Sequence, residues 1–436
     1  MPPSIDKRKL ALLITGDEVL YGDIVDTNSS LIAKALQEFG MRPSKKRVVG
    51  DDLLALVTEL KELSSEMDLL FINGGMGSTV DDRTNEAVST AFNLPLTEHP
   101  EAKAHLERRV GAQMDPQSVH YKQCRLPEGA ITFHNPVGSA LGYACLIGDC
   151  LLIATPGPPA EVGSMFEHHI IPWLRLRLQL GPAGELRRFF ILGLGESRIE
   201  RMIMAQYRDH NPFNELRLGF RAVAPFTEVK IWARPEQKEL LEQTNQEILD
   251  LFGPHCYSQG DELPGVIAKL LIDRQETFAS AESCTGGLMA SLITAQPGIS
   301  SIYWGGLVSY AYEAKETMLG VDHDSLVRNG AVSEKVAREM LLGLLKTSKA
   351  KWGISITGIA GPTGETAEKP LGTVYIGFGS AENPQVRHLV IQRERTQFQR
   401  FTALTALDLL RREIMGLDPY GPYYYDELTK GRLPQE

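Results

Sequence analysis

Two candidate nucleophiles, Ser283 and Cys284, stand side by side in the stretch Thr277 to Gly287. Residues Thr277 to Ala281 predict a short buried strand and Leu288 to Thr294 predict a helix, with two glycines just before that helix. A hydroxyl or thiol in such a turn lies at the positive end of the helix, where free backbone N–H groups can bind an oxyanion or a phosphate. An ordinary capped helix has the same pattern, so both interpretations stay open.

The residues that follow this turn indicate which base could serve it. Only two histidines, His323 and His388, follow, and neither stands in a turn beside the candidate nucleophiles, which disfavours a Ser-His-Asp arrangement. We expect Lys315 to end an apolar strand that runs through Leu307 to Tyr310, where it could lose enough water to act as a neutral base. The alternative is a surface lysine paired with a glutamate. No spaced pair of His or Cys ligands favours metal catalysis here.

Two polar loops near the start of the chain could bind a nucleotide. The first, Thr15 to Asn28, is rich in acids, and the second, Asn73 to Asp82, carries three glycines before a helix. Glycines let a backbone approach a ligand closely, and Asp81 or Asp82 could hold a divalent cation between ligand phosphates. The alternative is a flexible turn before an acidic helix N-terminus. The glycines are Gly74, Gly75 and Gly77.

Alternating strands and helices must position these loops. Strands are predicted at Leu10 to Thr15, Arg47 to Val49 and Leu69 to Ile72, with helices between them and Asp51 as the expected cap of the second helix. This order predicts a parallel sheet with helices on both faces, whose ligand lies beyond the carboxyl ends of the strands.

The whole chain is expected to be α/β, with two three-layer α/β domains that have mostly parallel sheets, joined by a small α+β domain. The expected domains cover residues 1–180, 185–255 and 260–416, and residues 417–436 form a tail. In the middle domain Arg217, Arg221 and Lys230 could line a ligand surface, although strand residues of this kind more often face solvent. The tail carries Tyr420, Tyr423, Tyr424 and Tyr425, which could pack on a partner subunit or be disordered.

Composition excludes several classes of protein. The chain has 436 residues, a net charge of −10 and five cysteines without a C-x-x-C pair, which argues against a disulfide framework and a structural zinc site. No apolar run reaches the ~18 residues that span a bilayer, and the first ten residues lack the core of a signal peptide. We therefore expect a cytoplasmic protein that binds small nucleotides, without membrane or nucleic-acid partners, and we expect a homodimer.

Several motifs resemble those of the CinA family. The pieces A-E-S-C-T-G-G, E-A-K-E-T-M-L-G-V and I-T-G-I-A-G-P-T-G resemble its carboxy-terminal domain. The loops T-G-D-E-V-L-Y-G-D-I-V-D-T-N and G-G-M-G-S-T-V-D-D resemble its amino-terminal domain, which is similar to the molybdopterin-binding domain of molybdenum-cofactor proteins. The middle domain resembles the KH-like insert of full-length members, so the resemblance extends over nearly the whole chain up to the tail.

The resemblance implies two hydrolytic activities. The carboxy-terminal domain would convert nicotinamide mononucleotide to nicotinate mononucleotide and ammonia without a cofactor. The amino-terminal domain would hydrolyse ADP-ribose to AMP and ribose 5-phosphate with a divalent metal cation. Two alternatives are kept: the amino-terminal domain could be a nucleotide-binding or pterin-binding module without turnover, or the protein could be a competence-associated interaction protein.

The resemblance also assigns roles to residues. Ser283 would be the nucleophile, Lys315 its base, and Tyr310 and Thr357 groups that orient the substrate or relay protons. Substrate contacts in the same domain would come from Glu282, Thr285, Gly286, Gly287, Gly358 and Gly361, with Gly286 and Gly287 presenting backbone amides to the substrate. In the amino-terminal domain they would come from Asp17, Asn28, Gly74, Gly75, Gly77, Thr79 and Asp82, with Asp81 and Asp82 as the candidate metal ligands.

Three positions depart from the family pattern. Ser78 replaces the usual proline of the glycine loop, Asp26 replaces an asparagine, and Tyr312 replaces the asparagine before E-A-K. A freer loop and an extra negative charge near a diphosphate both weaken preorganisation for substrate binding.

Overall fold

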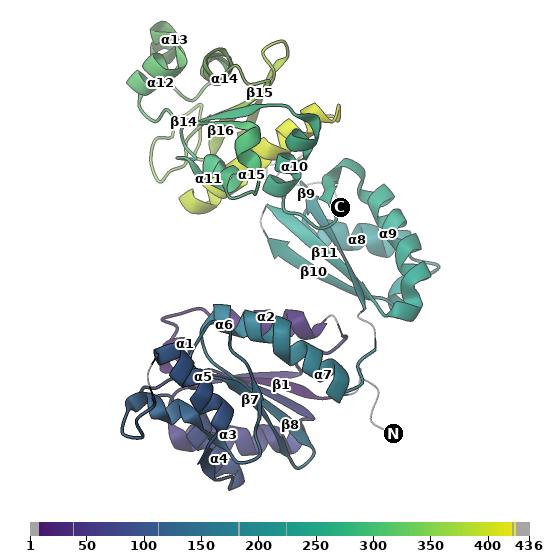
Figure 1. The fold of residues 1–436 in the computed structure, drawn as a ribbon. Helices are drawn as coiled ribbons and strands as arrows, with labels where there is room; N and C mark the ends of the chain where they lie inside the picture. The colour runs from purple at the N-terminus through teal and green to yellow at the C-terminus, as the bar shows by residue number, and fades with distance from the viewer. Residues whose placement is uncertain are drawn as a thin grey trace. The chain divides into compact units, whose positions relative to one another are not determined.

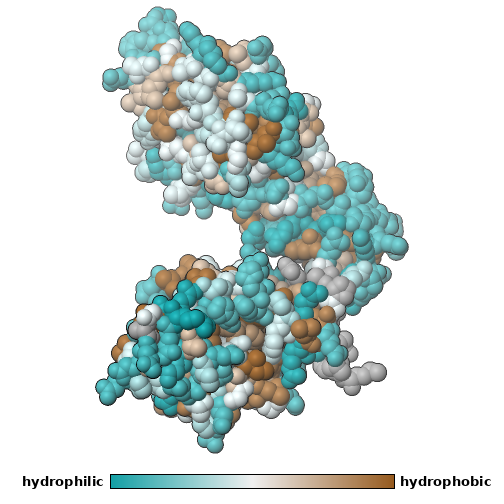
Figure 2. Space-filling view, viewed as in Figure 1, coloured by the Kyte–Doolittle hydropathy of each residue, from teal (hydrophilic) through white to brown (hydrophobic). Residues whose placement is uncertain are grey.

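The computed structural model divides the chain into two compact units, Met1–Glu185 and Leu186–Glu436 (Figure 1). The structure describes residues 8–420 and Tyr423, except residues 38, 112, 182, 183 and 224. No helix in this described part is long and apolar enough to cross a membrane. Hydrophilic side chains cover much of the face seen in Figure 2, and hydrophobic residues form small separate groups on it.

The first unit is built on a six-stranded sheet. Three of its four parallel strands are apolar and buried, as expected for a sheet covered on both faces, whereas the edge strand Lys45–Val49 is basic and partly exposed. Two antiparallel strands extend one edge. In spatial order the strands are β2 (Lys45–Val49), β1 (Leu10–Thr15), β3 (Leu69–Asn73), β8 (Cys150–Thr155), β7 (Gly142–Ile147) and β6 (Ile131–Phe133).

Helices cover both faces of this sheet (Figure 1). One face packs against α3 (Leu53–Glu66), α4 (Thr84–Phe92) and α5 (Pro100–Val110). The other packs against α2 (Asn28–Gln37), α6 (Pro159–Met165), η3 (Phe166–Ile170) and α7 (Ile171–Arg177). The prediction that Asp51 caps α3 is wrong. Asp52 is the N-cap, and its side chain accepts the N–H of Ala55 at 2.8 Å.

A four-stranded sheet opens the second unit. Its strands, in spatial order, are β10 (Arg217–Val223), β11 (Phe226–Ala233), β9 (Glu185–Leu192) and β12 (Cys256–Ser258). One face packs on α8 (Glu196–Gln206) and α9 (Lys238–Phe252). The cations Arg188, Arg221 and Lys230 all approach the buried carboxylate of Glu228. Two of the three basic residues suggested as a ligand surface, Arg221 and Lys230, thus pair with an acid of the same sheet.

A five-stranded mixed sheet follows, and it confirms the α/β class. In spatial order its strands are β14 (Tyr303–Val308), β13 (Phe278–Glu282), β15 (Trp352–Gly358), β16 (Thr373–Gly379) and β17 (Pro384–Val390), with parallel pairing among the first three. One face packs on α10 (Leu263–Arg274), α11 (Leu288–Thr294) and α15 (Arg395–Ile414). The other packs on α12 (Tyr312–Leu319), α13 (His323–Asn329) and α14 (Glu334–Ser348).

The segment around Lys315 differs from the expectation. Strand β14 ends at Val308, and Ser309 turns away after its N–H bonds to the carbonyl of Glu282 at 2.9 Å. Lys315 therefore lies in helix α12 rather than at the end of a strand. Its side chain is only 1% exposed, so the expected loss of water is present although the predicted element was wrong.

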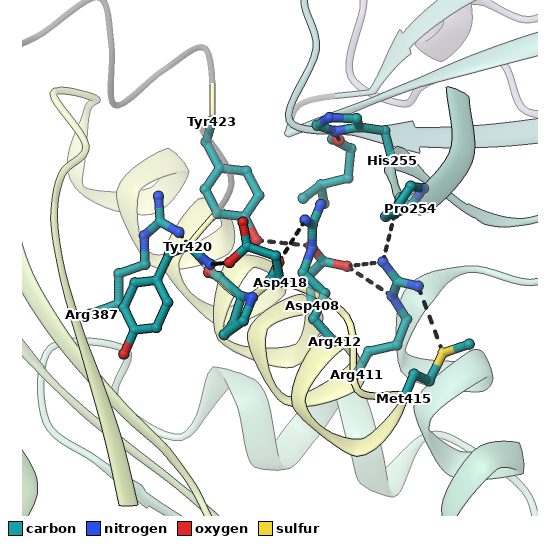
Figure 3. Close-up of polar contacts among 12 residues, drawn as sticks. Pro254, His255, Arg387, Asp408, Arg411, Arg412, Met415, Asp418, Tyr420 and Tyr423 are labelled. Carbon is teal, nitrogen blue, oxygen red and sulfur yellow. Dashed lines mark hydrogen bonds and ion pairs between the residues drawn. The ribbon is translucent and has the colours of Figure 1, made fainter. Parts of the chain in front are cut away.

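The start of the tail packs on its own chain around a buried acid (Figure 3). Asp408 of α15 accepts hydrogen bonds from Arg411 Nε, Arg412 Nε and the hydroxyl of Tyr423, each at 2.8 Å. Arg411 also donates to the carbonyl of Pro254 in the short helix η6 (Gly253–His255), which leads into β12. These contacts join the tail, α15 and the edge of the four-stranded sheet. Tyr424 and Tyr425 lie outside the described residues.

Candidate active site

Ser283 lies in the turn between β13 and α11, directly after the strand ends. Its N–H donates to the carbonyl of Ile356 on the neighbouring strand β15 at 3.0 Å, which fixes the start of the turn to the sheet. Its side chain is 9% exposed. The Nζ atom of Lys315 is 3.1 Å from Ser283 Oγ. The structure thus brings together the candidate nucleophile and the candidate base, which are 32 residues apart in the sequence.

Lys315 is held in the geometry of a proton acceptor. Its Nζ donates to the carbonyls of Ser309 at 2.6 Å and Tyr310 at 3.1 Å. A neutral amine has two N–H bonds and one lone pair, so these two carbonyls direct the lone pair toward Ser283 Oγ. Burial lowers the pKa of Lys315 to about 8, which makes the neutral form accessible near neutral pH. The buried pair therefore has the arrangement of an activated serine.

Cys284 does not compete with the serine. Its side chain is 4% exposed, and burial raises the pKa of the thiol to about 12. The thiolate, and not the thiol, is the nucleophile in cysteine chemistry. A thiol that keeps its proton at neutral pH is unsuited to this role, so Ser283 is the better nucleophile.

A cavity of about 260 Å³ opens beside the pair. The predicted residues Thr357, Gly358 and Gly361 line it, and so does Tyr310. Thr357 is buried and donates its hydroxyl hydrogen to the carbonyl of Ala331 at 2.8 Å, which leaves its oxygen able to accept a second hydrogen bond. Tyr310 is 59% exposed and lies at the rim.

Sequence reasoning missed Arg395, which also lines this cavity. Its guanidinium donates to the hydroxyl of Tyr310 at 3.0 Å and to the carbonyl of Gly361 at 2.8 Å. It thereby supplies a positive charge beside two predicted residues. Arg395 is the first residue of α15, and no sequence motif marks a single arginine of this kind.

The glycine amides of the turn do not face a substrate, so that prediction is wrong. The buried carboxylate of Glu282 accepts the N–H groups of Gly287 at 3.0 Å, Met289 at 3.1 Å and Ala290 at 2.9 Å. The N–H of Gly286 donates to the carbonyl of Ser283 at 3.1 Å. Both glycines have left-handed backbone angles, with φ of 63° and 95°, which explains the residue type.

Glu282 consequently has a different role from the expected substrate contact. It is fully buried, and its negative charge occupies the positive end of α11. A substrate phosphate cannot use that helix end. Thr285 is 2% exposed and lies outside the cavity wall, and its carbonyl accepts the N–H of Leu288. Glu282 therefore shapes the turn, and the side chain of Thr285 is buried away from the cavity, which leaves only its backbone near the reacting atoms.

A second cavity, of about 600 Å³, lies at the carboxyl ends of β1, β3 and β8 in the first unit. The predicted residues Asn28, Gly74, Gly75, Gly77, Asp81 and Asp82 line it. Asp17 and Thr79 do not. Thr79 supports the wall instead, because its N–H and hydroxyl both donate to Asp82 at 2.9 and 2.5 Å. The N–H of Asp17 donates to Asp51 at 3.1 Å.

Close backbone packing explains the glycines of this loop. A Cβ atom at Gly74, whose φ is 106°, would lie 2.6 Å from the carbonyl oxygen of Thr15. Asn28 fastens the two sides of the cavity, since its amide donates to Asn73 Oδ1 and to the carbonyl of Gly157. The loop is therefore a built part of the cavity wall.

The acidic side chains of this cavity fit a hard divalent cation together with a phosphate ligand. Within the described residues, no group of three or more His, Cys, Asp or Glu side chains is arranged to hold a metal ion by itself. Mg²⁺ needs no such group, because it binds through one or two carboxylates, water and substrate phosphates. Burial raises the pKa of Asp51, with smaller contributions from the charges of Asp17, Glu18 and Asp81. A cation would relieve this repulsion.

Asp26, which departs from the family pattern, does not leave an extra free charge in the cavity. Lys46 Nζ is 2.6 Å from its carboxylate, and the N–H and hydroxyl of Ser29 also donate to it. Burial alone would raise the pKa of Asp26, but these hydrogen bonds outweigh burial and the pKa is lowered. The charge is thus compensated within the protein.

Comparison with known proteins agrees with this architecture. A family model described as the CinA C-terminal domain matches residues 261–414, and one described as a probable molybdopterin binding domain matches residues 11–176. A CinA-like protein of Colwellia psychrerythraea is 36% identical over 412 residues, which are 93% of this chain and 94% of that protein. A putative competence-damage inducible protein of Thermoanaerobacter pseudethanolicus is 36% identical over 410 residues, which are 93% of this chain and 98% of that protein.

Among solved structures, a CinA superfamily protein of Klebsiella pneumoniae is 30% identical, with a TM-score of 0.35, and covers 35% of this chain and 96% of its own. The similarity to the two bacterial relatives extends over nearly the full length of both proteins compared. The chain belongs to the CinA family.

Proposed function

We propose that the carboxy-terminal domain hydrolyses the carboxamide of nicotinamide mononucleotide to the carboxylate and ammonia. The observation that carries this proposal is the buried Ser283–Lys315 pair, whose lysine has two carbonyl acceptors and a lowered pKa. Amide hydrolysis needs a nucleophile, a base and a later proton donor. The serine can be the nucleophile, and the neighbouring lysine can act first as the base and then as the proton donor. Arg395 at the cavity wall supports an anionic substrate, since guanidinium groups bind phosphates well.

Acylation would begin with proton transfer from Ser283 Oγ to the lone pair of Lys315 Nζ. Oγ attacks the carboxamide carbon, and the carbonyl oxygen becomes an oxyanion. Protonated Lys315 then returns the proton to the amide nitrogen, the C–N bond breaks and ammonia leaves. Water attacks the resulting ester, with Lys315 accepting its proton and giving it back to Ser283 Oγ. Each proton taken in one half of the reaction is thereby returned.

The test is ammonia release from nicotinamide mononucleotide, with nicotinate mononucleotide measured in parallel. Ser283→Ala should abolish release, and Cys284→Ala should retain it because the thiol is protonated and buried. The opposite pattern would refute the assignment of the nucleophile. Absence of both products with the wild-type protein would refute the substrate.

We propose further that the amino-terminal domain hydrolyses ADP-ribose to AMP and ribose 5-phosphate. The cavity of about 600 Å³, its glycine loop and its acidic wall support this proposal. Asp81 and Asp82 would hold a divalent cation, which neutralises charge on a diphosphate and favours attack by water. Gly74 and Gly75 would let the backbone approach the ligand.

A binding module without turnover is the competing proposal for this domain. Calorimetry with ADP-ribose and Mg²⁺, followed by a search for AMP, separates the two. Binding and AMP formation that both depend on Mg²⁺ would support hydrolysis, whereas binding without AMP would support the module. Asp82→Asn should weaken either process, because Asp82 lines the cavity and is fixed by Thr79.

A further inference from the structure

The backbone N–H groups of the Ser283 turn can be accounted for one by one. From Ser283 to Met289, five of the seven have an acceptor: Ile356 O for Ser283, Ser283 O for Gly286, Thr285 O for Leu288, and the Glu282 carboxylate for Gly287 and Met289. The other two, on Cys284 and Thr285, donate to no acceptor on another residue in the described part of the chain. Buried backbone N–H groups are nearly always paired, so two consecutive free ones need an explanation.

Both free N–H groups belong to peptide units whose carbonyls are held. The carbonyl of Ser283, in the same peptide as the Cys284 N–H, accepts from Gly286 at 3.1 Å. The carbonyl of Cys284, in the same peptide as the Thr285 N–H, accepts from Gln399 Nε2 at 2.9 Å. In a trans peptide the N–H points opposite to the C=O, so each hydrogen bond also fixes the direction of the free N–H.

The cavity wall indicates what these groups face. Ser283 and Cys284 both line the cavity, although the side chain of Cys284 is buried, so Cys284 contributes mainly its backbone to the wall. Once the carboxamide carbon of the substrate is bonded to Ser283 Oγ, its carbonyl oxygen would become an oxyanion next to these two peptides. Fixed N–H donors at such a place provide the strongest electrostatic stabilisation in acyl transfer.

We propose that the N–H groups of Cys284 and Thr285 form the oxyanion site of this domain, and that Gln399 is a positioning residue for it. This inference deepens the proposed amide hydrolysis and rests on it. When Ser283 Oγ forms its bond to the carboxamide carbon, the electron pair of the C=O moves to oxygen, where the two N–H groups donate to it. The pair returns to re-form C=O when the C–N bond breaks and ammonia leaves with the proton from Lys315. Gln399 touches neither the substrate nor the reacting atoms.

The test compares Gln399→Leu, which removes the donor to Cys284 O, with Gln397→Leu as the matched control. Gln397 is exposed on the same helix. Loss of a direct oxyanion donor lowers kcat by about 10²- to 10³-fold, so loss of its support should lower kcat by roughly tenfold or more. KM should change by less than about twofold, because the ground-state carbonyl needs the donors less than the oxyanion does. Gln397→Leu should behave as wild type.

Two further measurements separate positioning from a loss of folding. The pH midpoint of kcat should be the same in Gln399→Leu and wild type, because Gln399 makes no contact with Lys315. Pyridine-3-boronic acid, which forms a tetrahedral adduct with an activated serine, should bind the variant more weakly by about the same factor as kcat falls. Gln399→Met, which keeps the side-chain length, should show the same losses if Gln399→Leu is unstable.

An unchanged kcat and an unchanged boronic acid affinity in folded Gln399→Leu or Gln399→Met would overturn the inference. A rise in KM without a fall in kcat would also overturn the inference, because it would assign Gln399 to substrate binding. If wild-type protein fails to deamidate nicotinamide mononucleotide, the proposed substrate falls. The boronic acid comparison would still decide the role of Gln399, because that probe requires only Ser283 and its turn.

Discussion

The pH dependence of deamidation should report the burial of Lys315. The reaction needs the neutral amine, and burial lowers the pKa of Lys315 from its ordinary value of 10.5 to about 8. At pH 7 roughly one tenth of the enzyme would then carry a neutral lysine, and at pH 9 about nine tenths. We therefore predict that kcat/KM rises about tenfold between pH 7 and pH 9 and is nearly constant above pH 9. A lysine with its ordinary pKa would give a rise of about a hundredfold over the same interval, still increasing at pH 10.

The assay is the initial rate of ammonia release from nicotinamide mononucleotide between pH 6 and pH 10 at constant ionic strength. The substrate phosphate loses its last proton near pH 6, below the decisive interval, so it should not produce the same profile. Lys315→Met should show no activity at any pH, because it removes the base. A rate that climbs steadily to pH 10, or one that is flat from pH 6, would refute the assignment of a buried lysine base.

Three other predictions follow from particular contacts. Arg395→Ala should raise KM for nicotinamide mononucleotide by about 10- to 100-fold with a smaller effect on kcat, because a hydrogen bond to a charged group contributes about 1.5–3 kcal/mol. An equal rise in KM for nicotinamide riboside, which lacks the phosphate, would contradict a contact between Arg395 and the phosphate. Asp408→Ala should lower the free energy of unfolding in urea by about 3–5 kcal/mol, because it leaves two buried arginines without their carboxylate. Tyr423→Phe, which removes one hydrogen bond to Asp408, should lower it by about 1 kcal/mol. Equal losses in the two variants would contradict this ranking. Gly74→Ala should abolish calorimetric binding of ADP-ribose, because its Cβ would meet the carbonyl of Thr15, and unchanged binding would remove the glycine loop from the site.

The sequence was sufficient for the central pair because both residues stand in distinctive local motifs. The strand before Ser283 and the helix after it lie almost where the pattern predicts them. The motif also identified Lys315, but the expectation of a strand end was wrong. The chain leaves the sheet at Ser309 to bond with Glu282, and the helix begins three residues later. Periodicity over so few residues could not distinguish a strand end from a helix start.

The rest of the site depends on contacts that the sequence does not contain. Gln399 reaches the turn from α15, more than 100 residues later, through the packing of that helix on the sheet. Arg395 of the same helix reaches Gly361 and Tyr310 at the cavity wall. The sequence shows Glu282 beside the candidate nucleophile, but only the fold reveals that its carboxylate accepts three backbone N–H groups at the start of α11. For that reason the amides of Gly286 and Gly287 looked available when they are already bonded. Which backbone N–H groups stay unpaired depends on the three-dimensional fold.

Trapping with hydroxylamine tests the central claim, acyl transfer to Ser283 assisted by Lys315, most directly. Hydroxylamine added during turnover of nicotinamide mononucleotide should divert an acyl-enzyme to the hydroxamate, which mass spectrometry detects beside nicotinate mononucleotide. We predict hydroxamate with the wild-type protein and with Cys284→Ala, and none with Ser283→Ala or Lys315→Met. Rapid deamidation by the wild-type protein without any hydroxamate, or hydroxamate formed by Ser283→Ala, would contradict the account.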